Sequence, residues 1–147
     1  MEELLEDREQ SRARTEDIIA THVAGDLTGA WAKFMDHANI PMPVSVIEEM
    51  FGADRDPQVL ADEHFWFTRE MRASIRWEPD LAALRDSPSR IVVGIGEESA
   101  GQFCDRSSTA LAVALGIEPA RFPGGHIGFA EDPDTFAVRL RAVLTGN

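Results

Sequence analysis

The side chain most suited to acid–base chemistry is His126, because it lies in a short glycine-rich loop. The loop reads Pro123-Gly124-Gly125-His126-Ile127-Gly128-Phe129 and follows a short apolar stretch that is typical of a strand. Loops of this kind often carry function. Imidazole titrates near neutral pH, so His126 is a candidate general base. A solvent-facing loop histidine without a catalytic role is the alternative that the spacing leaves open.

Two carboxylates, Glu97 and Glu98, follow another apolar run upstream of this loop. If the two apolar runs form parallel strands, their carboxyl ends meet at one sheet edge, and the carboxylates lie on the same edge as His126. A carboxylate there can hold an imidazole in one tautomer. For at least one of the two glutamates, the alternative is a solvated side chain favoured by the dipole at a helix N-terminus.

Other motifs in the chain give weaker signals. Residues 94–99 approximate the dinucleotide-binding pattern G-x-G-x-x-G, but two carboxylates stand where pyrophosphate would lie, which argues against a nucleotide. Residues 96–101 resemble a nucleophile elbow but are one residue too long, and the sequence contains no G-x-S-x-G. Cys104 is interpreted as a packing residue inside a helix. No cofactor or metal site is expected. The remaining histidines lack metal-ligand spacing and are interpreted as surface or partly buried helix residues: His22, His37 and His64.

Composition limits the possible function classes. The 147 residues, with 44% hydrophobic and 27% charged, suit one globular core. The net charge of −12 repels nucleic acid and anionic membrane surfaces, so neither is an expected partner. The single cysteine excludes a disulfide framework. An acidic N-terminus and the lack of a long apolar segment predict neither a secretory signal nor a membrane span, and we expect a cytoplasmic protein.

The sequence divides into two regions, and the first, residues 1–74, is predicted to be helical. Apolar residues at near-helical spacing predict one long helix: Ile19, Val23, Leu27, Trp31 and Phe34. Two prolines end it in the segment 39–43. Ser45 is expected to cap a short helix that Gly52 closes. A further helix is expected to begin at Asp56-Pro57.

The second region, residues 75–147, has the order strand, helix, strand, helix. Residues 90–96 are apolar and β-branched without alternation, which is typical of a strand buried on both faces. A helix ended by Gly116 follows, then a second short strand over residues 117–122, and a last helix that begins at Asp132 or Pro133. This order predicts an α/β fold with two parallel strands and a right-handed crossover.

The second region resembles the C-terminal end of an α/β-hydrolase. The resemblance rests on residues 90–99, on Thr109-Ala110-Leu111-Ala112 with Leu115-Gly116, and above all on the loop 122–129 with Asp132-Pro133. It implies a partial α/β-hydrolase fold, in which a short parallel sheet has flanking helices and His126 is the general base. Residues 1–74 would then correspond to a helical cap. The aromatic side chains of that cap would line a substrate pocket or, for most of them, pack in its core: Trp31, Phe34, Phe65, Trp66 and Phe67.

The chain also departs from this family. The family's order is serine, acid, histidine, and the serine and the oxyanion loop would precede the first residue of this sequence. The spacing expected for the acid falls on Ser99, so Glu98 is the substitute. The resemblance therefore implies a hydrolase-like chain that is inactive alone.

Three interpretations of function remain open at this point. The first is the hydrolase-like chain that is inactive alone. Its two-stranded sheet needs cover for its edges, and an N-terminal-half chain, a homodimer or the helices of the first region would each supply it. Ser99 with His126 would make a minimal hydrolase that acts on a small, apolar, ester-like substrate. The third alternative is a non-catalytic binding or dimerisation module.

Overall fold

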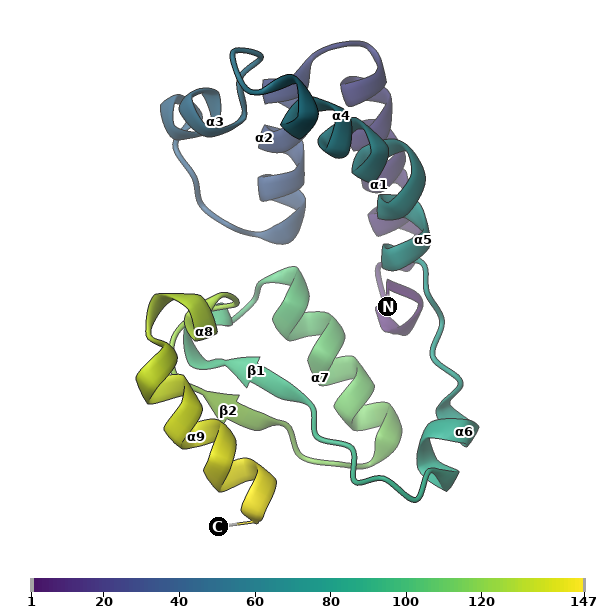
Figure 1. Ribbon diagram of the computed structural model, residues 1–147. Helices are drawn as coiled ribbons and strands as arrows, with labels where there is room; N and C mark the ends of the chain where they lie inside the picture. Colours follow the sequence, from purple (N-terminus) through teal and green to yellow (C-terminus); the bar gives the residue numbers. More distant parts are fainter. Residues whose placement is uncertain (1, 147) are drawn as a thin grey trace. The chain divides into compact units, whose positions relative to one another are not determined.

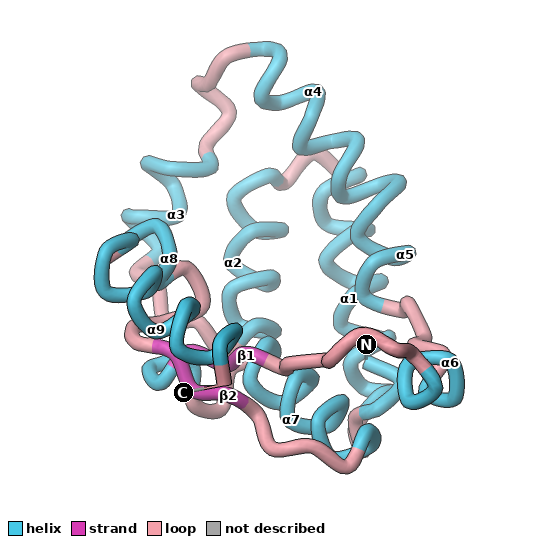
Figure 2. Tube along the Cα trace, turned by 60° about the horizontal axis from the view of Figure 1, so that its bottom comes forward, coloured by secondary structure: helices cyan, strands magenta, loops and turns pink. Residues whose placement is uncertain are grey.

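The computed structural model describes residues 2–146, and the chain divides into two compact units, Met1–Glu78 and Pro79–Asn147. Helices make up most of both units, and the second also holds a short parallel sheet (Figures 1 and 2). No helix within residues 2–146 is long and apolar enough to span a bilayer. The units are described separately below as unit 1 and unit 2.

Unit 1 is entirely helical in its described part. Its elements are η1 (Glu2–Leu4), α1 (Arg8–Val23), α2 (Leu27–Ala38), α3 (Val44–Phe51), α4 (Pro57–Phe65), the π-helical turn η2 (Trp66–Glu70) and α5 (Met71–Ile75). The core lies between α1, α2 and the run from α4 to α5. Its buried side chains are Ile18, Ile19, Ala30, Phe67 and Met71, and four partly buried ones pack against them: Trp31, Phe34, Trp66 and Ile75.

The expectation of one long helix through residues 19–34 is wrong, because the chain breaks between α1 and α2. Gly25 has a φ of +90°, a conformation that favours glycine. Asp26 then caps the second helix by accepting a hydrogen bond from the Gly29 amide at 2.8 Å. Val23, which the single stripe would bury, is 62% exposed.

The helix starts that follow are partly as expected. The capping role of Ser45 is wrong, because α3 begins at Val44 and Pro43 precedes it without a side-chain cap. The start at Asp56-Pro57 is confirmed, with Asp56 accepting a hydrogen bond from the Gln58 amide. Fixed φ makes proline suitable for the first helical position, so local chemistry alone determines this end.

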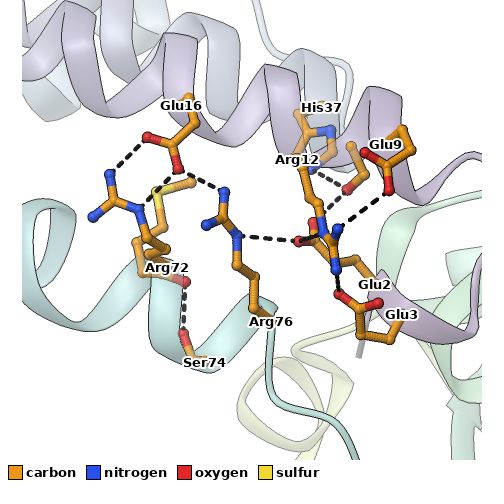
Figure 3. Close-up of polar contacts among 11 residues, drawn as sticks. Glu2, Glu3, Glu9, Arg12, Glu16, His37, Arg72, Ser74 and Arg76 are labelled. Carbon is orange, nitrogen blue, oxygen red and sulfur yellow. Dashed lines mark hydrogen bonds and ion pairs between the residues drawn. The ribbon is translucent and has the colours of Figure 1, made fainter.

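Ion pairs also join the helices of unit 1 (Figure 3). The Glu16 carboxylate on α1 accepts hydrogen bonds from Arg72 and Arg76, with contacts of 2.7 Å and 2.6 Å. The fully buried Glu2 carboxylate accepts a hydrogen bond from the Ser11 hydroxyl at 2.9 Å. These contacts connect η1, α1 and α5 in addition to the apolar core.

Unit 2 is built around two parallel strands. Its elements are α6 (Leu81–Asp86), β1 (Gly94–Gly96), the 3-10 turn η3 (Glu97–Ser99), α7 (Phe103–Leu115), β2 (Ala120–Phe122), α8 (Gly128–Glu131) and α9 (Pro133–Thr145). The register pairs Ile95 with Arg121 and Gly96 with Phe122. Ile95 packs with Ala112 of α7, whereas Phe122 stacks on Phe136 of α9. Because neighbouring strand residues point to opposite faces, α7 and α9 cover opposite faces of the sheet (Figure 1).

The predicted order of strand, helix, strand and helix is confirmed for unit 2, but both strands are shorter than expected. Only residues 94–96 and 120–122 pair, extended by one hydrogen bond from the Ala120 amide to the Val93 carbonyl. Val92 is 38% exposed, so the interpretation of residues 90–96 as a strand buried on both faces is wrong for this residue. The end of α7 at Gly116 and the start of α9 at Pro133 are confirmed.

Candidate functional site

The turn after β1 and the loop after β2 lie in contact at the carboxyl ends of the strands. The Glu98 amide donates a hydrogen bond to the Gly124 carbonyl at 3.1 Å. Gly96 lies so close to the loop that a Cβ atom there would be 2.6 Å from the carbonyl oxygen of Gly125. A side chain at position 96 would therefore push the histidine loop away from the sheet edge.

A cavity of about 300 Å³ lies at this edge. Residues from both strands, the turn η3, helix α7 and the histidine loop line it. Among the candidates from the sequence, His126, Ser99 and Cys104 contribute to its wall, and Glu98 does not. The location agrees with the general rule that ligands of open α/β sheets bind outside the carboxyl ends of parallel strands.

His126 and Glu98 are not joined directly in the described part of the chain. Both side chains are exposed, and no hydrogen bond or ion pair connects them. The link between them runs through the backbone, from the Glu98 amide to Gly124, two residues before the histidine. The structure thus brings their two loops together without placing carboxylate and imidazole in contact.

Ser99 is the most buried polar residue of the cavity wall. It is 1% exposed, and its Oγ has no hydrogen-bond partner within residues 2–146. Buried hydroxyl groups are nearly always paired, so an unpaired one needs an explanation. The sequence indicated Ser99 only through the spacing of its glycines, which resembles a nucleophile elbow. The burial of Ser99 depends instead on the packing of η3 against the rest of unit 2.

An aromatic wall completes the cavity, and sequence reasoning missed it. The rings of Phe122 and Phe136 stack with centroids 4.9 Å apart, and Phe129 meets Phe136 edge-on at 6.1 Å. Phe129 is 56% exposed. The available signal was a phenylalanine in each of the two helices after the histidine loop.

Cys104 lies in the first turn of α7, as expected, and is half-buried. Its thiol donates a hydrogen bond to the Gln102 side-chain oxygen at 3.6 Å. No group of three or more His, Cys, Asp or Glu side chains in residues 2–146 is placed to hold a metal ion. The polar side chains in the cavity wall are the imidazole of His126, the thiol of Cys104 and two hydroxyl groups, those of Ser99 and Ser108, and the rest of the wall is apolar.

Unit 1 contains a histidine pair that sequence spacing did not indicate. His22 is buried, and its Nε2 lies 3.2 Å from Nδ1 of His64 on α4, within hydrogen-bond distance. Its ring also stacks on Phe67 at 4.3 Å. Burial lowers the pKa of His22, the charge of Glu63 opposes this shift, and His64 adds to it.

The aromatic residues of unit 1 mostly pack in its core. Phe67 is fully buried, Trp31, Phe34 and Trp66 pack against the core, and Phe65 is 55% exposed.

No family model matches this chain, and a search of curated proteins finds no match.

Proposed function

We propose that residues 79–147 form the histidine-carrying part of an α/β-hydrolase-like hydrolase, with His126 as general base and an ester or related bond as its target. The observation that carries this proposal is the cavity at the carboxyl ends of two parallel strands, with His126 in its wall. General-base catalysis of acyl transfer uses a positioned base, most often an imidazole, beside the site where the substrate carbonyl lies. His126 is exposed and can supply this base. Its loop packs closely against Gly96 and accepts a hydrogen bond from the Glu98 amide.

In this proposal His126 removes the proton from a serine hydroxyl as the hydroxyl attacks the carbonyl carbon, and then gives the proton to the leaving group. The serine comes from outside these 147 residues, because they contain no G-x-S-x-G. Glu98 is the proposed acid, on the ground that its amide is bonded to the histidine loop. A base and an acid activate nothing without the nucleophile, so the chain alone is inactive.

The proposal includes a partner for the sheet and a role for unit 1. The outer edge of β1 pairs with no further strand in the described residues, which favours pairing with another strand. At the outer edge of β2, the Arg121 carbonyl accepts a hydrogen bond from Arg139 Nε at 2.8 Å. An N-terminal-half chain that carries the nucleophile, or a second copy of this chain, would continue the sheet. Unit 1 would serve as the helical cap. The free Cys104 suits a reducing compartment, and we propose the cytoplasm.

The test uses a fluorophosphonate label, which reacts with activated serines. The purified chain should take up no label, and it should hydrolyse p-nitrophenyl acetate no faster than free imidazole at the same concentration, because imidazole alone attacks this activated ester slowly. A chain carrying an affinity tag, expressed in its native cells, should recover a second polypeptide that takes up the label. The matched His126→Gln chain should recover the same polypeptide without labelling. Equal labelling with both chains would contradict the role of His126, and an adduct mapped to Ser99 would instead support a minimal hydrolase.

A second candidate function, a non-catalytic dimerisation module, is favoured by the apolar side chains that unit 2 exposes. Val113, Val138 and Leu144 are 75%, 66% and 64% exposed. Light scattering over a wide concentration range would detect a dimer. A strictly monomeric chain that recovers no partner would count against this module.

A further inference from the structure

The cavity of unit 2 combines one buried polar atom with a mostly apolar wall. The Ser99 Oγ is buried without a partner in the described residues. An unpaired buried hydroxyl carries a desolvation cost that is recovered when an acceptor binds to it. We propose that this cavity binds a small, neutral, aromatic molecule with one carbonyl oxygen, and that the oxygen accepts the hydrogen bond of Ser99.

The aromatic wall accounts for the apolar part of this ligand. Phe122 and Phe136 already stack, and the half-exposed Phe129 offers a ring that nothing in unit 2 covers completely. Aromatic rings prefer offset or edge-on neighbours, so a ligand ring continues the arrangement that these side chains begin. A volume of about 300 Å³ lies at the lower end of ligand cavities, which limits the ligand to a small molecule.

The charges around the cavity favour a neutral ligand over an anion. None of the residues that line it is a lysine, an arginine or a carboxylate. A carboxylate buried there would have no cationic partner, and burial of an unpaired charge is costly. The net charge of −12 also repels anions from the surface as a whole. A ketone or an ester therefore suits the site better than a carboxylic acid at neutral pH.

This inference rests on the proposed function in one respect, since it identifies the ligand's carbonyl with the group on which His126 would act. Binding itself needs neither the nucleophile nor a partner. The experiment therefore measures binding to the full chain without turnover. A hydrolase that fails the labelling test can still have this binding site, and the reverse also holds.

Three compounds of similar size separate the contributions of the ring, the carbonyl and the charge. Acetophenone has a ring and a carbonyl, ethylbenzene lacks the carbonyl, and benzoate carries a charge. Each is titrated into the ¹⁵N-labelled chain, and the dissociation constant is taken from the amide shifts of unit 2. Acetophenone should bind about fivefold more tightly than ethylbenzene, the value of one ordinary hydrogen bond. Benzoate should bind most weakly.

Three variants assign this preference to residues. Ser99→Ala should remove the advantage of acetophenone and leave ethylbenzene unchanged. Ser108→Ala, the matched serine of the same wall, should change neither. Phe129→Ala should weaken both compounds, and because Phe129 is exposed this variant should fold normally.

The proposal is overturned if acetophenone and ethylbenzene bind equally, if benzoate binds more tightly than either, or if Ser99→Ala keeps the full preference. Loss of the preference in Ser108→Ala alone would also overturn it, because the hydrogen bond would then belong to the other serine. Amide spectra of each variant, compared with those of the parent chain, show whether unit 2 has kept its fold.

Discussion

Acidification from pH 7.5 to pH 5.5 should destabilise unit 1 through His22. Its pKa is lowered in the folded state, chiefly because the ring is buried against Phe67. The unfolded chain, with the ordinary histidine pKa of about 6.5, therefore binds more protons than the folded chain in this range. The stabilising contribution is complete above the unfolded pKa and is lost as the pH falls toward the folded one.

The magnitude follows from proton linkage. One proton taken up on unfolding changes the free energy of unfolding by at most about 1.4 kcal/mol per pH unit. Glu63 opposes the shift of the His22 pKa and His64 adds to it, so the observed slope reports the balance of these charges with burial.

The assay is urea unfolding followed by tryptophan fluorescence. The chain has three tryptophans, Trp31, Trp66 and Trp77, and all lie in unit 1, so the signal reports this unit alone. The His22→Gln variant should lose the pH dependence contributed by His22. The His126→Gln variant, changed in unit 2, should keep it. Equal slopes in the parent chain and in His22→Gln would refute the reasoning.

Three further predictions concern acid stability and packing. Burial of Phe67 predicts a loss of about 3–5 kcal/mol in Phe67→Ala, measured by urea unfolding, whereas the matched variant of the exposed Phe65 should lose far less. The hydrogen bond from Arg72, with its charge and that of Arg76, lowers the pKa of Glu16 to about 2. The stabilising contribution of the Glu16 carboxylate is present above the unfolded pKa and is lost as the pH falls toward 2. Because Glu16 is half exposed, Glu16→Gln should lower the free energy of unfolding at pH 7 by on the order of 1 kcal/mol. On acid titration, this variant should lose less stability than the parent chain. Gly96→Ala should destabilise unit 2 by about 1–3 kcal/mol in thermal unfolding followed by circular dichroism, since its Cβ meets the Gly125 carbonyl; an unchanged midpoint would contradict the observed approach of the two loops.

Features set by neighbouring residues could be predicted from the sequence. A helix begins at Asp56-Pro57 because the Asp56 side chain caps it and the proline ring holds the backbone φ of Pro57 near the helical value. Gly116 ends α7 in a left-handed conformation that glycine adopts readily. The break between α1 and α2 at Gly25 was not predicted, because the apolar spacing of α1 continues by coincidence into α2. Apolar spacing alone does not indicate a turn.

Features that depend on distant residues could not be predicted. His22 and His64 are 42 positions apart, and only the packing of α1 against α4 brings their rings together. The aromatic wall likewise needs β2, α8 and α9 in place. The position of His126 beside a cavity follows from the order of the strands, whereas the exposure of Glu98 and the burial of Ser99 depend on how η3 turns after β1.

The π-helical turn η2 determines which side chains face the core of unit 1 along residues 63–75. Glu63, Phe67, Met71 and Ile75 recur every four residues and face the interior, yet in a regular α-helix such a row drifts by about 40° at each step. The wider turn, closed by a hydrogen bond from the Met71 amide to the Trp66 carbonyl, offsets this drift. The π turn thus holds one residue more than the α-helical turn that it replaces. Loss of one residue within residues 66–70 that restored a regular helix would leave Met71 facing the core, because seven steps from Glu63 turn an α-helix by about 700°, which is within about 20° of two full turns. Substitutions that made the turn α-helical at its present length would instead rotate Met71 out of the core and Arg72 away from Glu16. Related chains should therefore either keep the wider turn or lack one residue here and have a regular helix.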